Sequence, residues 1–343
     1  MERRRLSTDG GRTLGCQRLA LLLFGLLVGL AATEIVLRVA LPAQSYHFPV
    51  ARITDDRFSQ RAGQVLNDSD HGVRYSFDAS GFRTAGEIRP PASRTVLFVG
   101  DSFTQGFGVN DAESFPAVTC DRLAERGVNA RCLNAGTTGF GTAHELRLLQ
   151  RLLQRDDLVV DAVVFQVLPN NDLRDNWEDG GFEVDGGELV VRDPPKIPAP
   201  VWWRDTLLNN SLARGSRLVV LAANAWFRGA GLDLHYDATA FALERRLLQE
   251  VVATTQKRSI PIVIVVTATG WELGLVQSQP FDERARLDFV TAVVQALGVP
   301  YVDARNVANA PEHYIAGDGH YSVAGNALIA QALAPQLELL LRR

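Results

Sequence analysis

Two segments far apart in the chain carry residue types that together perform acyl transfer. Ser102 stands in the run Gly100-Asp101-Ser102 directly after an apolar stretch, where a nucleophilic serine can be presented at the end of a buried strand. Near the C-terminus, Asp318 and His320 are two residues apart. In an extended segment both side chains lie on the same side, so Asp318 can orient His320 as a general base. The combination predicts a serine acyl-transfer site.

Two further segments offer groups that stabilise the oxyanion formed during acyl transfer. The glycine-rich run 134–139 precedes a predicted helix, and its backbone N–H groups lie near the positive end of that helix. Gly139 is the expected donor, and Gly136 competes with it because either glycine also serves the geometry of the turn. Asn171 follows another apolar run and offers a side-chain amide as a third donor.

Other residues compete for the same roles. Asp303 also ends a predicted strand and is the alternative acid for orienting the base. His313 is the alternative base, but it lacks an acid two residues before it. We expect His144 at the surface, in the first turn of a helix, and we expect Asp172 and Asp175 to cap a loop rather than to take part in catalysis.

The elements that must position these residues alternate between strands and helices. Short apolar runs predict buried strands at 95–99, 131–134, 162–168, 260–266 and 299–303, and helical patterns cover 116–126, 142–154, 238–257, 281–297 and 322–341. Thr142 and Glu145 are expected to form a capping box at the start of their helix. The alternation predicts an α/β fold, doubly wound, with a mostly parallel five-stranded sheet and helices on both faces. Ligands of such sheets bind at the carboxyl ends of the strands, where the residues above are found.

The segments that contain Ser102, Gly139, Asn171 and the Asp318–His320 pair follow one another along the chain as four sequence blocks. These blocks, in this order, resemble those of the SGNH (GDSL-type) hydrolase superfamily over residues 95–340. The resemblance implies that Ser102 is the nucleophile and that its own N–H helps to form the oxyanion hole. It also implies that Gly139 and Asn171 complete the oxyanion hole, and that His320 and Asp318 are the base and its acid. Such a site requires no metal and no cofactor.

The chain departs from the superfamily pattern at two positions. Pro169 stands where the third block usually has glycine, which leaves the following asparagines in place. Asp318 is two residues before the histidine, whereas the common spacing is three. Membrane-linked relatives that resemble alginate-acetylating proteins have this shorter spacing, so the resemblance still implies a complete triad.

The N-terminal region is typical of a membrane anchor. Residues 1–18 form a basic leader, and residues 19–41 are apolar over a length sufficient to span a bilayer. A basic flank keeps the N-terminus in the cytoplasm, so we expect a single-pass protein of the inner membrane with its catalytic domain on the periplasmic or extracellular side. A cleaved signal peptide, with its site near Gly29-Leu30-Ala31, is the rival interpretation.

The remaining chain divides into a connector and a catalytic domain. Residues 42–93, rich in turn formers, are expected to be a juxtamembrane connector or an irregular edge of the domain, and residues 94–343 the hydrolase-like domain. An insertion at 176–236 interrupts the alternation and contains a predicted hairpin around Gly186-Gly187. Trp177, Trp202 and Trp203 in this insertion either line a substrate cleft or serve packing.

Composition excludes several other classes of protein. With 46% hydrophobic and 22% charged residues, the chain is globular rather than disordered. A net charge of −4, without a basic block beyond the leader, does not indicate nucleic-acid binding. The three cysteines form neither a disulfide framework nor a zinc motif, although Cys120 and Cys132 can pair if the domain is exported.

The sequence therefore predicts an exported, membrane-anchored serine esterase that hydrolyses acyl esters, such as acetyl esters, of a cell-envelope glycan or lipid. One alternative is an O-acyltransferase that uses the same residues to acylate an envelope polysaccharide. A second is an envelope-binding module without catalytic activity. A two-metal phosphoesterase arrangement is disfavoured, because it requires histidines where Ser102 and Asp172 stand.

Overall fold

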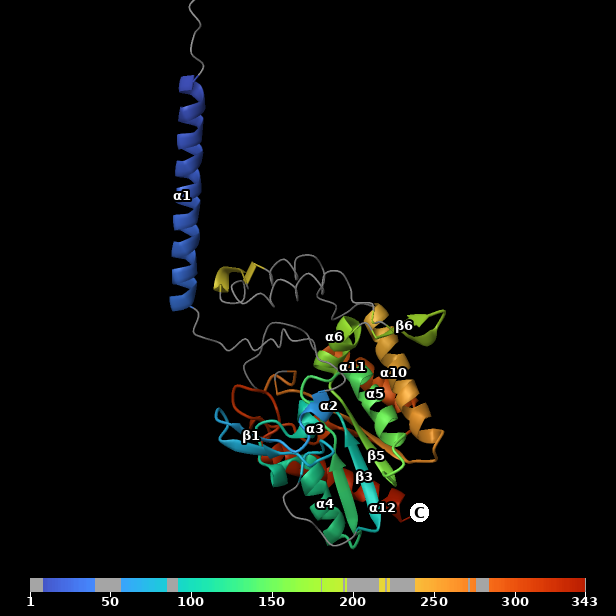
Figure 1. Ribbon diagram of the computed structural model, residues 1–343. Helices are drawn as coiled ribbons and strands as arrows, with labels where there is room; N and C mark the ends of the chain where they lie inside the picture. The colour runs from blue at the N-terminus through green and yellow to red at the C-terminus, as the bar shows by residue number, and fades with distance from the viewer. Residues whose placement is uncertain are drawn as a thin grey trace, which may run out of the picture. The chain divides into compact units, whose positions relative to one another are not determined.

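A parallel five-stranded sheet lies at the centre of the catalytic part of the chain (Figure 1). The computed structural model describes residues 9–40, 57–84, 92–179, 181–193, 195, 216–219, 221–222, 238–270, 272–275 and 284–342. These residues belong to two compact units, one of residues 1–52 with 199–233 and the other of residues 53–198 with 234–343. The second unit contains the sheet and every predicted site residue.

The sheet has the order β4-β3-β5-β8-β9 and all its neighbouring strands are parallel. Its strands are β3 (Arg94–Val99), β4 (Ala130–Asn134), β5 (Ala162–Val167), β8 (Ile262–Val266) and β9 (Tyr301–Asp303). Every residue of β5 and β8 is buried, as expected for strands covered on both faces. The predicted fold class is confirmed, with boundaries shifted by at most two residues at each strand end.

Helices cover both faces of the sheet (Figure 1). Leucine and valine side chains of α5 (Thr142–Leu153), α10 (Ala238–Gln256) and α11 (Arg284–Ala296) form one hydrophobic cluster with one face. Side chains of α4 (Phe115–Glu125) and α12 (Val323–Leu341) form a second cluster with the other face. Loops, short helices and one longer helix follow the carboxyl ends of the strands. The short helices are α3 (Ser102–Gln105), η1 (Asp111–Glu113), η3 (Ala304–Asn306) and η4 (Pro311–His313), and the longer one is α6 (Pro169–Asp179).

The start of α5 differs from the prediction. Its N-cap is Gly141, which has no side chain, and the Ala143 N–H donates to Asn176 Oδ1 of α6 at 2.7 Å, so the expected capping box of Thr142 and Glu145 is wrong. Both of those side chains are instead fully buried against neighbouring helices. His144, expected at the surface, is also buried, with Nε2 at 3.1 Å from Asp179 Oδ1. The sequence pattern located the helix but could not indicate that its first turn packs inward.

Part of the expected connector packs against the sheet. Residues 57–84 contain α2 (Arg57–Gln60) and the antiparallel hairpin of β1 (Val65–Asp68) and β2 (Val73–Ser76). Phe58 and Phe82 belong to the same hydrophobic cluster as α5, and their rings meet edge to face at 5.3 Å. This segment is therefore part of the catalytic unit rather than a spacer.

The expected insertion is divided between the two units. Strands β6 (Phe182–Asp185) and β7 (Glu188–Val191) pair as the predicted hairpin and belong to the catalytic unit. Residues 199–233 belong to the unit of the N-terminal helix, where Glu34 accepts hydrogen bonds from the Arg217 and Leu218 N–H groups. Trp202 and Trp203 lie outside the described residues.

The N-terminal helix α1 (Asp9–Ala40) contains a segment, Gln17–Val39, that is long and apolar enough to cross a membrane. None of that segment is buried in the protein. By length and composition, α1 can be a membrane anchor or a signal sequence.

A disulfide joins Cys120 of α4 to Cys132 of β4, with the Cα atoms 5.9 Å apart. The pairing that the sequence left open is therefore made. It ties a helix on one face of the sheet to the edge strand next to it.

Candidate active site

The chain turns sharply after β3 to present Ser102. Asp101 is the N-cap of α3, and its Oδ1 accepts a hydrogen bond from the Phe103 N–H at 2.8 Å. Ser102 is thus the first helical residue and is not needed as the cap. A Cβ at Gly100 would lie 2.2 Å from Thr104 Oγ1, so only glycine allows the strand to pass so close to the helix.

Ser102, His320 and Asp318 form a hydrogen-bonded chain. Ser102 Oγ lies 2.8 Å from His320 Nε2. His320 Nδ1 contacts Asp318 Oδ1, and the same oxygen accepts a hydrogen bond from the His320 backbone N–H at 3.2 Å. This is the relation of nucleophile, base and orienting acid expected for a serine acyl-transfer site.

The His320 ring is also held by packing. Phe103 lies in α3 and Phe107 follows that helix in the sequence. Their ring centroids are 4.7 Å and 4.6 Å from the centroid of the His320 ring. Burial acts to raise the pKa of Asp318, but hydrogen bonding to His320 outweighs this effect and holds that pKa below its ordinary value. Asp318 therefore remains an anion that favours one tautomer of the imidazole, with its proton on Nδ1.

The two competing residues are used elsewhere. The Asp303 carboxylate forms an ion pair with Arg305, whose Nη2 lies 2.7 Å from Asp303 Oδ2. The same side chain also caps η3. His313 Nδ1 accepts a hydrogen bond from the Ala310 N–H at 3.1 Å, which closes the turn of η4. Neither side chain takes part in the hydrogen-bonded chain that contains Ser102.

The loop after β4 distinguishes the two candidate glycines. The Gly136 N–H donates to Asn134 Oδ1 at 2.9 Å, and a Cβ at Gly136 would lie 2.1 Å from the Gln105 nitrogen. Gly136 therefore serves close packing against α3. Gly139 has a φ of +84°, and within the described residues neither its N–H nor that of Ser102 donates a hydrogen bond. Both N–H groups are therefore available as candidate donors to an oxyanion.

Asn171 lies in the first turn of α6 rather than in a loop. Pro169 is the first residue of that helix, a position where its missing N–H carries no cost. The buried Asn171 Oδ1 has no hydrogen-bond partner among the described residues. Asp172 was expected to cap a loop but lies inside α6, where its Oδ2 accepts a hydrogen bond from the Leu168 N–H, just before the helix, at 2.8 Å. Asp175 does not cap it, because its carboxylate accepts from Arg174.

Behind this turn lies a cluster of buried carboxyl groups that the sequence analysis did not identify. Thr142 Oγ1 lies 3.3 Å from Asp172 Oδ2 and 3.1 Å from Glu244 Oε1, while Asn176 Nδ2 donates to Glu244 Oε2 at 2.6 Å. Burial raises the pKa of Glu244 from its ordinary 4.5 to about 7. Burial first, and the nearby carboxylates second, raise the pKa values of Glu145 and Asp172 well above their ordinary range. The cluster is therefore held at least partly protonated at neutral pH.

The cluster makes folding stability depend on pH. Because the folded-state pKa of Glu244 is raised, the unfolded chain releases that proton first, so stability falls as pH rises from about 4.5 through about 7. Glu244→Gln imitates the protonated group. We expect it to unfold at a higher temperature than the wild type at pH 8, with the difference shrinking towards pH 5.

Thermal melts of both proteins across that pH range measure this effect. Glu250→Gln is the matched control, because Glu250 lies on the same helix and pairs with Lys257 at the surface. A Glu244→Gln protein that is less stable than the wild type by the same amount at every pH would mean that Glu244 is held as an anion.

Gln166 is a further positioning residue that the sequence analysis missed. Its Oε1 accepts from the Asp101 N–H at 2.9 Å and from Thr104 Oγ1 at 3.0 Å, while its Nε2 donates to Thr267 Oγ1 at 2.9 Å. It thereby fixes the backbone next to Ser102. A single polar residue inside an otherwise apolar buried strand was the available signal.

One known family and several solved structures resemble this chain. The sequence model of the GDSL-like lipase/acylhydrolase family matches residues 98–328. No curated protein sequence matches the chain at a significant level. Among solved structures, the chain is similar to TesA, with 17% identity, a TM-score of 0.44, and coverage of 72% of this chain and 99% of TesA.

Two further solved structures are esterases by description. The psychrotrophic esterase EstA from Pseudoalteromonas sp. has 12% identity and a TM-score of 0.43, over 73% of this chain and 100% of EstA. The acetyl xylan esterase AlAXEase has 15% identity and a TM-score of 0.40, over 71% of this chain and 99% of the esterase. The family match, which spans both Ser102 and His320, shows that the chain belongs to the GDSL-like lipase/acylhydrolase family of serine ester hydrolases.

Proposed function

We propose that this protein is an exported, membrane-anchored esterase that hydrolyses acyl esters through a covalent intermediate on Ser102. The observation that carries the proposal is the 2.8 Å contact between Ser102 Oγ and His320 Nε2, with Asp318 at the other ring nitrogen. Membership of a family of ester hydrolases supports the reaction class.

In the first step, Ser102 Oγ attacks the ester carbonyl carbon and His320 Nε2 takes the hydroxyl proton. Asp318 stabilises the imidazolium that forms. As the tetrahedral intermediate collapses, the carbon–oxygen bond to the alcohol breaks, and His320 gives its proton to the departing alcohol oxygen. The acyl group is then bound to Ser102 as an ester.

The negative oxygen of the tetrahedral intermediate requires donors that are already in place. We assign this role to the N–H groups of Ser102 and Gly139, which donate to no other group within the described residues, and to the Asn171 side chain. A fixed donor stabilises charge that develops in the transition state, and costs no reorganisation at that moment.

We expect Asn171→Ala to lower kcat by about 10²- to 10³-fold, the effect of losing one oxyanion donor, with a much smaller change in KM. Initial rates with p-nitrophenyl acetate measure it. Asn170→Ala, in the same first turn of α6, is the neighbouring control. Equal losses in both variants would argue for damage to α6 rather than for a lost donor.

In the second step, water attacks the acyl-enzyme and His320 again accepts a proton, so the acid is released and Ser102 is restored. Transfer to a sugar hydroxyl would follow the same course with another acceptor. An assay that follows both free acid and acylated envelope oligosaccharide decides between them. Free acid as the main product supports the esterase. Acylated sugar as the main product would show that the protein is an O-acyltransferase instead.

Labelling of the purified full-length protein with a fluorophosphonate probe tests the proposal as a whole. We expect the label on Ser102, and none on the Ser102→Ala protein. Hydrolysis of p-nitrophenyl acetate should disappear in parallel. An unlabelled wild-type protein without esterase activity would refute the proposal.

The proposed location rests on α1, which has an arginine-rich flank before its apolar segment Gln17–Val39. The disulfide between Cys120 and Cys132 is consistent with an oxidising compartment. We therefore expect protease added to the outside of spheroplasts to digest the catalytic domain while the membrane is still closed. Immunoblotting for the domain measures this, and a cytoplasmic marker protein controls for leakage. A domain that is protected until detergent is added would contradict the exported orientation.

A further inference from the structure

Two arginine side chains from residues 57–84 bind the loop that contains Gly139. Arg57, the first residue of α2, donates from Nη1 to the Thr138 carbonyl oxygen at 2.8 Å. That carbonyl and the Gly139 N–H belong to the same planar peptide unit, and in a trans peptide they point in opposite directions. By binding the oxygen, Arg57 therefore determines the direction in which the Gly139 N–H points.

Arg61 binds the same loop two peptide units earlier. Its Nη1 donates to the Gly136 carbonyl oxygen at 2.6 Å, and its Nε donates to the Gly81 carbonyl oxygen at 2.7 Å. On the opposite side of that peptide, the Thr137 N–H donates to the Gly100 carbonyl oxygen at 2.9 Å. The peptide is thus held from both sides, between Arg61 and the turn that presents the nucleophile.

Gln105 connects this loop to the nucleophile helix. It is the last residue of α3, which begins at Ser102, and its Oε1 lies 3.3 Å from Arg61 Nη1. The same oxygen accepts hydrogen bonds from the Thr138 N–H at 2.9 Å and from Thr138 Oγ1 at 3.1 Å. Arg61, Gln105 and Thr138 therefore form a bridge between the serine and the loop that precedes Gly139.

The burial of Arg61 is costly. Arg61 is only 7% exposed, and within the described part of the chain no carboxylate lies at ion-pair distance from it; Asp78 favours its charge from further away. Its guanidinium lies over the rings of Phe58 and Phe77, at 4.8 Å and 4.6 Å from their centroids. Burying a charged group without a direct ion-pair partner opposes folding. A role in holding the loop accounts for a residue that folding alone does not favour.

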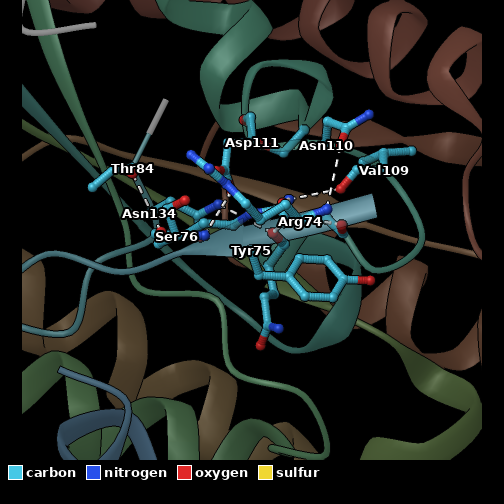
Figure 2. A network of polar contacts seen from close by, with 12 residues as sticks. Arg74, Tyr75, Ser76, Thr84, Val109, Asn110, Asp111 and Asn134 are labelled. Carbon is cyan, nitrogen blue, oxygen red and sulfur yellow. Dashed lines mark hydrogen bonds and ion pairs between the residues drawn. The ribbon is translucent and has the colours of Figure 1, made fainter. Parts of the chain in front are cut away.

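Arg83 provides the contrast, because it is buried with an ion-pair partner. Its Nε lies 2.9 Å from Asp111 Oδ1, an atom that also accepts from the Ser76 N–H at 3.0 Å. Its Nη2 donates to the Val109 carbonyl oxygen at 2.6 Å, and Figure 2 shows Ser76, Val109 and Asp111 within one polar network. Arg83 thus ties the hairpin β1–β2 to the loop after α3, with its charge balanced.

We infer that Arg57 and Arg61 are positioning residues of the oxyanion hole, supplied by the segment that precedes the sheet. Arg57 orients the Gly139 N–H, and Arg61 holds the loop against the nucleophile helix. The inference rests on the function proposed above. It predicts that loss of either guanidinium lowers the rate of the chemical step more than it weakens substrate binding, because a misdirected donor matters most when the oxyanion develops.

The test uses the full-length protein with p-nitrophenyl acetate and with the fluorophosphonate probe. We expect Arg57→Met and Arg61→Met to lower kcat by about 10- to 100-fold, less than the loss of a whole donor, with KM changed by about twofold at most. Fluorophosphonate labelling of Ser102 should slow in parallel. Arg57→Lys keeps one donor on a stem of similar length and should recover most of the lost rate.

Arg74→Met is the matched control, because Arg74 lies in β2 of the same segment with an exposed side chain. Its kcat should equal that of the wild type. If the Arg57→Met and Arg61→Met proteins turn over as fast as this control, or if Arg57→Lys is as slow as Arg57→Met, the inference is wrong. If Arg61→Met does not fold, the Arg57 variants decide alone, since that residue is only half-buried. A wild-type protein that neither hydrolyses ester nor is labelled refutes the proposed function itself, which separates the two failures.

Discussion

Replacing Ser102 by alanine is expected to reduce kcat for a short acyl ester by about 10³-fold or more while leaving thermal unfolding unchanged. The variant removes the only oxygen that lies within hydrogen-bond distance, 2.8 Å, of His320 Nε2 among the described residues. His320→Ala should cost a similar factor, because the serine hydroxyl then has no base. The double variant should be no slower than either single one, since the two residues act as a unit.

Initial rates with p-nitrophenyl acetate, together with circular dichroism melts, measure both effects. His313→Ala is the control for the histidine, because that ring accepts a hydrogen bond from the Ala310 N–H and not from the serine. Retained activity in the Ser102→Ala protein would show that another residue is the nucleophile. If His313→Ala loses as much activity as His320→Ala, the assignment of His320 as the base is wrong.

Asp318→Asn is expected to lower kcat by about 10³- to 10⁴-fold, although it changes the shape of the side chain very little. The carboxylate accepts a hydrogen bond from the N–H at His320 Nδ1, and this leaves Nε2 free to accept the proton of Ser102. An asparagine amide can donate to Nδ1 instead, which favours the tautomer with its proton on Nε2. In that tautomer His320 is unable to act as the base.

The matched control is Asp303→Asn, because Asp303 is the other acid that the sequence analysis considered for orienting His320. Asp303 forms an ion pair with Arg305, so this variant should lose some stability and keep its kcat while folded. Steady-state rates below the unfolding temperature of each protein separate the two effects. A larger loss in Asp303→Asn than in Asp318→Asn would reverse the assignment of the acid.

Much of the fold was predictable because buried parallel strands have a simple sequence pattern. Runs such as 162–168 are continuously apolar, since both faces of the strand are covered, and the helices between them have the periodicity of one buried face. The pattern failed where polar residues pack inward. Thr142 and Glu145 have the sequence of a capping box, yet contacts with other helices bury both of them.

Much of the candidate site was also predictable from the chain, because in a parallel sheet the ends of separate strands meet at one edge. That rule alone places Ser102, Gly139 and Asn171 together, and the spacing of Asp318 and His320 makes them a pair. The structure brings Ser102 and His320 within 2.8 Å across a separation of 218 residues. Their roles in catalysis remain predictions for the variants above.

By itself, the sequence determined the strand-end chemistry, since local periodicity and spacing decide which side chains leave the sheet at the same edge. Only the tertiary structure decided between equivalent local signals. The ion pair of Asp303 with Arg305 favours Asp318 as the acid, and the close approach of Gly136 to α3 favours Gly139 as the backbone donor. The part played by Arg61, 75 residues before the carbonyl that it binds, has no local pattern at all. Hydrogen bonds between distant segments depend on how the helices and loops pack in three dimensions, and periodicity along the chain carries no record of that packing.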